Sequence, residues 1–343
     1  MSYRANPLLF GVKNSYYKEG RKKPTLKFVD LFCGIGGFHK AIIYATNNLN
    51  IDVECVFASD IDESARKTYI LNYGIEPAGD ITQIKENSIP SHDILFAGFP
   101  CQAFSVAGYR KGFEDTRGTL FFDVARIAKY HSPSIIFLEN VKGLVGHDKG
   151  RTFKKIVEVL EKELGYIVKH KVLNTSVHTS IPQTRERIYI VASKKELSDS
   201  IFPKETSSVK EISQLLDSNK QEEKYYYNTH KYYDILKQDI TKRETVYQWR
   251  RHYVRENKSN QCPTLTANMG TGGHNVPLIK DSYGIRKLTP KECLRFQGFD
   301  EEFSFPDIAL SQKYKQIGNS VTVPLASELL SNIIKELENE ILP

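Results

Sequence analysis

The feature of this sequence that most constrains its fold is a repeated order of apolar segment, small-residue turn and helix. The first unit begins at Lys27 with KFVDLF, passes through CGIGG, and continues as FHKAIIYATNN, whose apolar residues fall at helical spacing. VECVFASD (53–60) and the polar helix ESARKTYILNY form the second unit, and HDILFAGFP (92–100) contains the next strand. Because strands that alternate with helices pack into a parallel sheet covered by helices, we predict an α/β fold with a parallel sheet.

This alternation continues to about residue 196 and then fades. SIIFLEN (134–140) and RIYIVAS (187–193) are predicted strands, and YIVKHKVLN is another. Between Lys204 and about Gly284, tyrosines cluster in KYYYNTHKYY, and CPTLTANMGTGGHNVP is rich in Thr, Gly and Asn. Regular periodicity is lost there, so we predict a second, smaller domain of short strands and loops.

Two helices are predicted near the C-terminus. RKLTPKECLRFQGF contains a helix that opens with Thr289 as N-cap, Pro290 at the first helical position and Glu292 three residues after the cap. SVTVPLASELLSNIIKELENEIL is predicted to be a closing amphipathic helix. Its apolar stripe consists of Leu325, Leu329, Ile333 and Leu337.

Composition excludes several classes of protein. No apolar run approaches the roughly 18 residues that a membrane span needs, and the stretch from Pro7 to Val12 is too short for a signal peptide. We therefore expect an intracellular, cytoplasmic protein that does not contact a membrane. The five cysteines are widely spaced and form no CxxC pair, which argues against a disulfide framework and a structural zinc site. A net charge of +7 permits nucleic acid as a partner but does not require it.

A glycine turn and an acidic residue suggest a ligand site. Gly34, Gly36 and Gly37 follow the first strand, where a ligand can approach backbone amides at a helix N-terminus, although the lysine of a phosphate-binding P-loop is missing. Asp60 ends the next strand, 26 residues after Gly34, where an acidic side chain commonly holds ribose hydroxyls. Asp80 offers a further polar group. A nicotinamide dinucleotide and S-adenosylmethionine both contain that ribose, and a purely structural glycine turn with two capping aspartates is the alternative.

A second group of residues suggests nucleophilic chemistry. In GFPCQAFSVAG (98–108), Cys101 lies just beyond a strand, at the edge of the sheet where such folds bind ligands. Glu139 also ends a strand, while Arg185 and Arg187 are two residues apart at the entry to another and would share one face. A thiol, an acid and two arginines at one rim suit nucleophilic addition to a polar ring. Taken singly, each has a plain alternative as a packing thiol, a solvated strand end or a surface charge.

Seven segments together resemble the bacterial-type DNA (cytosine-5)-methyltransferase family. They are DLFCGIGGF, GDI, GFPCQAFSVAG, ENVKGL, QTRERIY, RKLTPKECLRFQGF and QIGNSV, and they occur in the family's order from about residue 27 to 325. The resemblance implies a Rossmann-like methyltransferase domain that binds S-adenosylmethionine, with a smaller target recognition domain. It also implies a cofactor pocket formed by Phe32, Gly34, Ile35, Gly36, Gly37, Asp60, Ile61, Asp80, Ile81, Pro100, Asn319 and Ser320.

The resemblance also implies a mechanism. A thiolate from Cys101 would add to carbon 6 of a flipped-out cytosine, Glu139 would hydrogen-bond or protonate N3, and Arg185 and Arg187 would steady the base and the nucleophile loop. Carbon 5 would then accept the methyl group, and no metal is needed. The loop from Ser105 to Arg117, which is glycine-punctuated and charged, is the expected lid and DNA contact.

The resemblance divides the chain into three parts. Residues 26–196 and 312–343 would form the catalytic domain, 197–311 the target recognition domain, and 1–25 a basic extension that is either an arm on DNA or disordered. Double-stranded DNA would be the substrate, contacted by Arg250, Arg251, Arg255, Lys258, Thr264 and Leu265, where Thr264-Leu265 matches a dipeptide typical of that domain. For the four basic residues, a solvated basic face is the alternative.

Rival functions remain open from the sequence. A relative that methylates transfer RNA at cytosine is the main alternative, followed by a catalytically silent DNA-binding relative and a nicotinamide-linked oxidoreductase. We further expect a monomer that associates with the nucleoid through DNA. A restriction endonuclease that acts on the same site without forming a stable complex is the expected functional partner.

Overall fold

A six-stranded mixed sheet forms the centre of the molecule. A computed structural model of the protein describes residues 24–47, 49, 51–100, 120–250, 253–270 and 276–341. The strand order is β2-β1-β3-β4-β7-β5. The bounds are β1 (Thr25–Leu31), β2 (Asp52–Ser59), β3 (Ile94–Ala97), β4 (Ile135–Val141), β5 (Ile167–Asn174) and β7 (Glu186–Ser193). The α/β class predicted from the alternation is confirmed.

The prediction of a parallel sheet is wrong for one strand. β2, β1, β3 and β4 pair in parallel, but β7 runs antiparallel to both of its neighbours, β4 and β5. Between β5 and β7 the chain forms only α5 (Thr175–His178) and the two-residue β6 (Gln183–Thr184). A short connection returns the chain beside the strand it has just left, whereas a parallel neighbour needs a longer crossover. The connection between YIVKHKVLN and RIYIVAS is too short for a crossover helix, and this reverses the strand.

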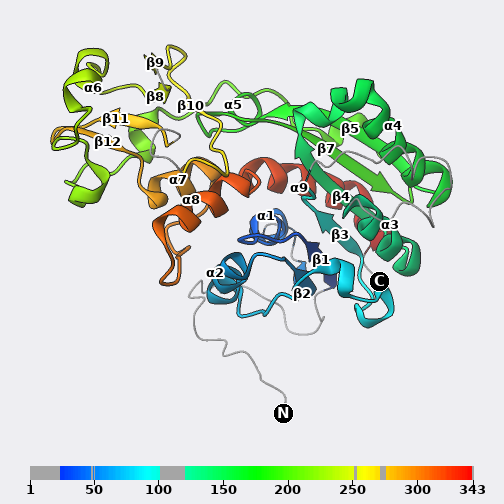
Figure 1. The fold of residues 1–343 in the computed structure, drawn as a ribbon. Coiled ribbons are helices and arrows are strands. Elements are labelled where there is room, and N and C mark those ends of the chain that lie inside the picture. The colour runs from blue at the N-terminus through cyan, green and yellow to red at the C-terminus, as the bar shows by residue number, and fades with distance from the viewer. Residues whose placement is uncertain are drawn as a thin grey trace, which may run out of the picture.

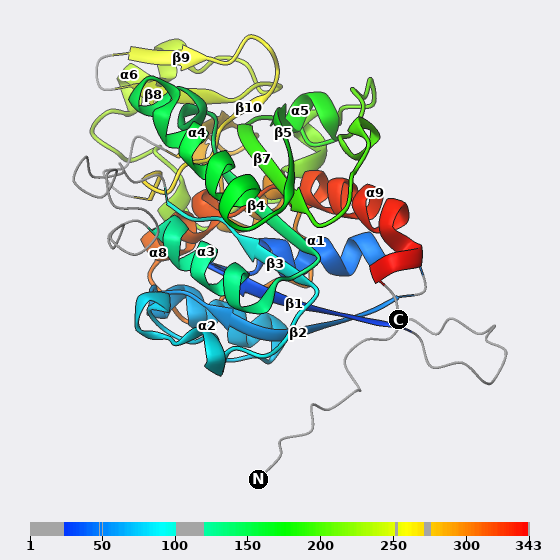
Figure 2. The same cartoon turned by 90° about the vertical axis from the view of Figure 1, so that its right-hand side faces the viewer.

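Helices cover both faces of the sheet because its central strands are apolar on both sides. α1 (Gly37–Thr46) and the closing helix α9 (Val323–Ile341) lie side by side on one face, and α3 (Leu120–His131) and α4 (Arg151–Glu158) lie on the other (Figures 1 and 2). Successive residues of β1 pack on opposite faces of the sheet: Phe28 packs under α1 and α9, and Val29 packs under α3. The closing helix predicted from its apolar stripe is confirmed and completes the core.

Short helical segments connect these elements. α2 (Glu63–Tyr73) begins at Asp62, whose side chain accepts hydrogen bonds from Ser64 N and Ala65 N, and ends at Gly74 in the left-handed conformation. The remaining segments are η2 (Ile81–Gln83), η3 (Glu86–Ser88), η6 (Lys142–Gly150), η7 (Val159–Glu163), η8 (Asp199–Ile201), η9 (Ile212–Leu215) and η10 (Glu223–Tyr225).

A second, four-stranded sheet forms a smaller lobe, in the region where periodicity fades in the sequence (Figure 1). Its order is β12 (Ile285–Lys287), β11 (Leu278–Lys280), β8 (Tyr247–Arg250) and β9 (Tyr253–Glu256), with α6 (Tyr233–Asp239) beside it. One small core of its own includes Tyr247, Leu278 and Ile285. Ile279 and Leu288, however, belong to the same buried cluster as α1 and α9, so the lobe shares part of its core with the larger sheet.

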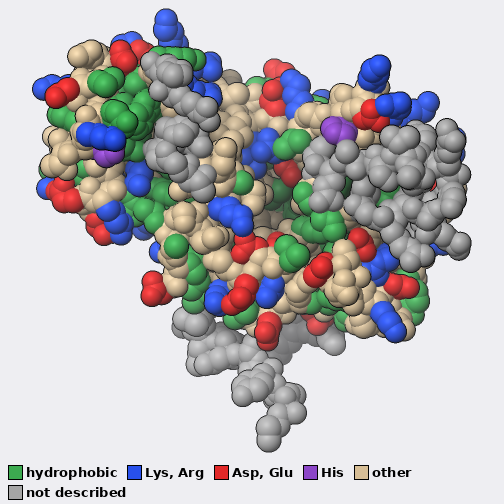
Figure 3. All heavy atoms as spheres, viewed as in Figure 1, with side chains coloured by type: hydrophobic (Ala, Val, Ile, Leu, Met, Phe, Trp, Pro, Cys, Tyr) green, Lys and Arg blue, Asp and Glu red, His purple; other side chains and the backbone are tan. Residues whose placement is uncertain are grey.

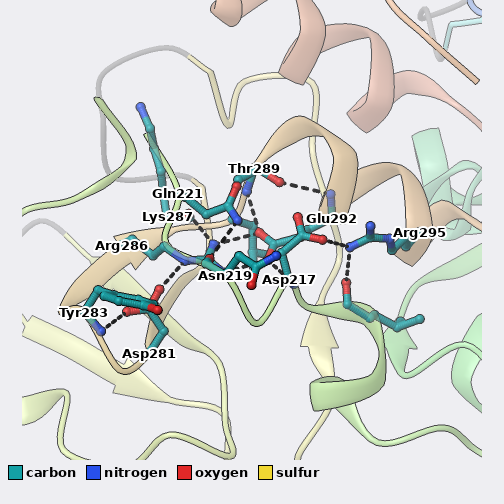
Figure 4. A network of polar contacts seen from close by, with 12 residues as sticks. Asp217, Asn219, Gln221, Asp281, Tyr283, Arg286, Lys287, Thr289, Glu292 and Arg295 are labelled. Carbon is teal, nitrogen blue, oxygen red and sulfur yellow. Dashed lines mark hydrogen bonds and ion pairs between the residues drawn. The ribbon is translucent and has the colours of Figure 1, made fainter. Parts of the chain in front are cut away.

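The polypeptide returns from the small lobe through α7 (Pro290–Gln297) and α8 (Leu310–Asn319). The predicted start of α7 is confirmed: Thr289 and Glu292 form a capping box, and Pro290 occupies the first turn. The Glu292 carboxylate has a second function, because it accepts two hydrogen bonds of 2.7 Å from Arg286 in β12 (Figure 4). It also accepts a hydrogen bond from Asp217 N at 2.9 Å, so one buried carboxylate connects three segments.

We expect Glu292→Gln to lower the free energy of unfolding by about 3–5 kcal/mol, because it leaves the fully buried Arg286 guanidinium without its bidentate partner. Chemical denaturation monitored by circular dichroism would measure the change. Glu301→Gln is the matched control: Glu301 also pairs with an arginine, Arg295, but its side chain is 58% exposed, so we expect a loss below about 1 kcal/mol. Equal losses for the two variants would contradict the conclusion that the buried Glu292 carboxylate holds the three segments together.

Candidate active site

A cavity of about 350 Å³ opens at the carboxyl ends of the four parallel strands. Each strand contributes its following residues to the wall: Phe32 after β1, Asp60 after β2, Pro100 after β3, and Glu139 at the end of β4. Figure 3 shows this face of the molecule hollowed between the lobe of the small sheet and the lobe of the large one. The position is that of ligand sites in open α/β sheets, and the volume is within the range of small-molecule sites.

The glycine turn forms one wall of the cavity and depends on left-handed backbone conformations. Phe32, Gly34 and Gly36 all have positive φ, at 55°, 53° and 79°. A Cβ on Gly34 would meet no atom within 4 Å, so this backbone faces open space, whereas a Cβ on Gly37 would lie 2.6 Å from Ser320 Oγ. Gly34 thus leaves room for a ligand, and Gly37 allows the C-terminal segment to pack closely against α1.

Gly36 differs from the other predicted cofactor residues. It is not among the residues that line the cavity, and a Cβ there would lie 2.2 Å from the ring of Tyr73. The expectation that Gly36 lines the pocket is therefore wrong: its backbone faces α2. The sequence pattern shows that a glycine is needed at this position but not on which side the space is limited.

Asp60 links the glycine turn to the second strand. Its Oδ2 accepts a hydrogen bond from Gly34 N and its Oδ1 accepts one from Asp62 N, both at 2.8 Å. Burial raises the pKa of this carboxyl, and the two backbone donors oppose the rise. Next to it, Ile61 is 74% exposed at the cavity and presents apolar surface without a partner in the described chain. Asp60 therefore sets the shape of the turn besides being available to a ligand.

Two further predicted cofactor residues, Asp80 and Ile81, form hydrogen bonds to neighbouring segments of the chain. Asp80 caps η2 through a 3.0 Å hydrogen bond from Thr82 N, and Ile81 O accepts a hydrogen bond from Arg126 at 2.6 Å. Both residues also line the cavity, so the capping role suggested as the alternative for Asp80 coexists with a place at the site.

The far wall of the cavity comes from the C-terminal part of the chain. Asn319 and Ser320 lie there, as predicted, because α8 and α9 pack against α1 and α2. Two residues that the sequence reasoning did not select hold this wall. Lys315 forms a 2.7 Å ion pair with Asp62, and Gln316 accepts a hydrogen bond from Thr68 at 2.8 Å. Gln316 is the first residue of the quoted segment QIGNSV, but the sequence did not indicate that its partner would be Thr68 on α2.

The floor of the cavity contains a buried acid beside an arginine. Glu139 Oε1 lies 3.1 Å from Arg187 Nε, and the two side chains are only 10% and 14% exposed. Burial raises the pKa of Glu139, and the charges of Arg187 and Arg185 partly offset the rise. A carboxyl whose pKa is raised is protonated over a wider range of pH and is therefore a better proton donor.

Asn140, the middle residue of ENV, also belongs to the site. Its Nδ2 donates a 2.7 Å hydrogen bond to Phe99 O, the carbonyl just before Pro100. This bond fixes the end of the chain segment that leads to Cys101. Asn140 was within a quoted segment of the sequence, but only the structure shows that it binds the backbone carbonyl of Phe99.

Arg185 lines the cavity, and two of its guanidinium nitrogens donate to backbone carbonyls. The side chain is 2% exposed, and its guanidinium donates to Leu265 O at 2.8 Å, Ser320 O at 2.7 Å and Gly318 O at 3.2 Å. Burial lowers its pKa to about 9, and Arg187 adds to the effect. Arg187 pairs with Glu139, whereas Arg185 holds three carbonyl groups together, so the action of the two arginines on the base and the nucleophile loop stays a prediction.

The predicted DNA-contact residues fall into three groups. Arg250, Arg255 and Lys258 are exposed on the small lobe, where Arg250 and Arg255 project from the face of β8 and β9 opposite to its core. Thr264 is half-buried and donates to Thr184 O at 2.6 Å, while Leu265 is 1% exposed in the core. A direct contact between the Leu265 side chain and DNA is therefore excluded. Cys101, Ser105, Arg117 and Arg251 lie outside the described residues, as do residues 1–23 of the N-terminal extension.

Two other properties of the described chain bear on function. In the described part of the molecule no helix is both long and apolar enough to cross a membrane. Nor do its His, Cys, Asp and Glu side chains gather in any group of three or more that could hold a metal ion.

The sheet order and the cavity at its carboxyl edge define a Rossmann-like methyltransferase. The model of the C-5 cytosine-specific DNA methylase family matches residues 26–335. The chain is 48% identical over 321 residues to the type II methyltransferase M.Bsp6I of Bacillus sp. strain RFL6, covering 91% of this chain and 99% of that protein. It is 39% identical to M.HpaII of Haemophilus parainfluenzae, covering 94% of each.

Solved structures agree on the fold. The S. pombe Dnmt2 methyltransferase matches with a TM-score of 0.71 at 21% identity, covering 91% of this chain and 99% of that one. A putative DNA modification methyltransferase of an E. coli prophage matches with a TM-score of 0.64 at 19% identity, covering 91% and 99%.

This chain belongs to the C-5 cytosine-specific DNA methylase family. It is a DNA (cytosine-5)-methyltransferase of the restriction–modification type, and DNA is favoured over transfer RNA as its substrate.

Proposed function

We propose that the cavity binds S-adenosylmethionine beside a cytosine flipped out of duplex DNA, and that the protein methylates carbon 5 of that cytosine within one short sequence. The observation that supports this most strongly is the Glu139–Arg187 pair, which lies in the same cavity as the glycine turn and Asp60. The same cavity therefore contains an acid whose pKa is raised and a wall that is suited to a nucleoside ligand.

The residues present fit S-adenosylmethionine. Gly34 leaves open space at the turn, the Asp60 carboxylate is suited to ribose hydroxyls, and the exposed Ile61 offers an apolar surface for adenine. When bound, S-adenosylmethionine supplies an electrophilic methyl group on its sulfonium sulfur. The chain has to hold that methyl group in line with carbon 5 and to make carbon 5 nucleophilic.

The chemistry on the base is assigned to residues at the floor and the adjoining loop. The thiolate of Cys101 forms a bond to carbon 6, and the electrons of the 5,6 double bond move toward N3, where Glu139 donates a proton or a hydrogen bond. Carbon 5 then forms a bond to the methyl group as the bond between that methyl group and the sulfonium sulfur breaks and S-adenosylhomocysteine is released. A base removes the carbon 5 proton, N3 gives back any proton it received to Glu139, and re-formation of the 5,6 double bond expels the cysteine thiolate. Arg187 keeps Glu139 oriented and compensates its charge whenever it is ionised.

Target recognition is assigned to the small lobe. The solvent face of β8 and β9 carries Arg250 and Arg255 beside the exposed Tyr253, a combination that suits phosphate and base-edge contacts. Residues 26–196 with 312–343 would then be the catalytic domain, and 197–311 the recognition domain. The shared core described above means that the two would be closely joined.

Bisulfite sequencing of plasmid DNA from cells that express the protein tests the proposal directly. We expect cytosine protection at every copy of one short sequence and nowhere else. Transfer of tritiated methyl groups to duplex DNA and to transfer RNA, measured side by side, provides the comparison of substrates. Labelling of transfer RNA without protection of plasmid DNA would refute the proposal.

We also infer a restriction endonuclease with the same target in the host, since the chain is similar to proteins named type II methyltransferases. Plasmid modified by this protein should then resist the endonuclease that cuts the sequence found by bisulfite sequencing. Complete cutting of the modified plasmid would contradict the inference.

Asp60→Ala is expected to weaken binding of S-adenosylhomocysteine by about 10- to 100-fold, since hydrogen bonds to a charged group contribute about 1.5–3 kcal/mol. Isothermal titration calorimetry would measure the dissociation constant. The matched control is Asp93→Ala, because Asp93 also accepts a 2.8 Å hydrogen bond from a β1 backbone amide, Lys27 N, but at the opposite end of the strand. Unchanged affinity in Asp60→Ala would remove Asp60 from the cofactor site.

A further inference from the structure

We propose that Gln183 and Gln297 are positioning residues that connect the recognition segment 264–267 to the cavity wall 318–320, so that binding of target DNA strengthens binding of the cofactor. The inference rests on the proposed function. Neither glutamine lines the cavity, and both are 0% exposed, so each acts through the groups that it holds.

Gln183 holds the recognition segment. Its Oε1 accepts a 3.1 Å hydrogen bond from Leu265 N, and its Nε2 donates to Phe296 O at 2.6 Å and to Gln297 Oε1 at 3.3 Å. The backbone around it is fixed as well, because β6 pairs with β10 (Cys262–Pro263), directly before the recognition segment. One amide side chain therefore joins residue 265 to the end of α7.

Gln297 continues the connection to the cavity wall. Its Nε2 donates to Ile317 O at 2.8 Å and to Ser320 O at 3.3 Å. Its Oε1 accepts from Gln183 and from Thr322 Oγ1, the latter at 3.3 Å. Both ends of this amide are occupied, so rotating it would leave buried donors and acceptors unpaired. A displacement of the recognition segment is then opposed by the same bonds that hold residues 317–320.

Two further contacts connect the recognition segment to the cavity wall. Arg185 bridges Leu265 O on one side and the carbonyls of Gly318 and Ser320 on the other. Gly318 itself packs against the recognition segment so closely that a Cβ would lie 2.2 Å from Thr266 O. Gly318 and Ser320 are also cavity residues. The recognition segment and the cavity wall are therefore in direct contact with each other.

This arrangement has a thermodynamic consequence. If DNA favours one position of the recognition segment, and that position is shared with the cavity wall, then DNA and cofactor must each raise the affinity for the other by the same factor. The quantity to measure is this coupling factor: the dissociation constant of S-adenosylhomocysteine for the free enzyme divided by that for the enzyme saturated with duplex.

The experiment measures the factor by calorimetry with a duplex that contains the site found by bisulfite sequencing, and with a shuffled duplex. We expect at least about fivefold for the wild-type enzyme with the target duplex. For Gln297→Met, which keeps the length of the side chain but forms no hydrogen bonds, we expect a factor clearly below that of the wild type, with the remainder carried by Arg185 and Gly318. Tyr166→Phe is the control, since it removes one buried hydrogen bond, to Pro133 O, remote from both segments, and should keep the wild-type factor.

A wild-type factor near one, or a wild-type factor retained in Gln297→Met, overturns the inference. If Gln297→Met does not fold, Gln183→Met replaces it, because it removes the hydrogen bonds to Leu265 N, Phe296 O and Gln297 Oε1, and a factor as large as that of the wild type again overturns the inference. Methylation of plasmid by the wild-type enzyme is scored separately. If the wild-type enzyme methylates DNA but shows no coupling, only the proposed connection between the recognition segment and the cavity wall is refuted. If the wild-type enzyme does not methylate DNA, the proposed function is refuted.

Discussion

Replacement of Cys101 by serine is expected to abolish methyl transfer while leaving duplex binding close to that of the wild-type protein. Addition to carbon 6 requires a thiolate, and a serine hydroxyl stays protonated at neutral pH and is a far weaker nucleophile. Cys101 directly follows Pro100, which lines the cavity, and the preceding carbonyl of Phe99 is held by Asn140. Tritiated methyl transfer and an electrophoretic mobility-shift assay would measure the two effects.

A duplex with 5-fluorocytosine at the target position makes this test specific to the covalent step. Fluorine at carbon 5 cannot leave as a proton does, so the wild-type enzyme should remain bonded to the DNA in denaturing gels, and Cys101→Ser should not. Cys55→Ser is the matched control, since Cys55 is a partly buried thiol on β2 that does not line the cavity. Turnover in Cys101→Ser, or covalent trapping of that variant, would eliminate the proposed mechanism.

Glu139→Gln is expected to slow methyl transfer by about 100- to 10,000-fold. Glutamine has nearly the same shape and can still form a hydrogen bond, but it cannot transfer a proton to N3. Burial raises the pKa of Glu139, which favours its protonated form and hence its use as a proton donor. Single-turnover kinetics with saturating duplex and S-adenosylmethionine would isolate this step from binding and product release.

Glu186→Gln provides the comparison for Glu139→Gln. Glu186 begins β7 at the same edge of the sheet, but its side chain is 44% exposed and pairs with Lys142. We expect this variant to turn over normally. Similar rates for the Glu139 and Glu186 variants would show that the buried acid has no part in the chemistry. Calorimetry with S-adenosylhomocysteine would confirm that Glu139→Gln still forms the cofactor site.

The strands and the start of α7 could be predicted because their determinants are local. The buried run that ends β1 and the box formed by Thr289 and Glu292 depend on residues within a few positions of one another. The positions of Glu139 and Asp60 at strand ends were predictable for the same reason, since parallel strands bring their carboxyl ends to one edge.

The sequence alone determined the strands of the large sheet, the capped start of α7, the closing helix α9 and the chemical groups at the strand ends, whereas α6 and α8 were not predicted from it. The tertiary structure decided that β7 runs antiparallel, that Gly36 faces Tyr73, and that Leu265 is buried. It also decided that Arg185 binds carbonyls 80 and 135 residues away. The physical reason is that periodicity reports which face of an element is apolar. The partner of a buried polar group depends on segments that meet only after the sheets and helices have packed.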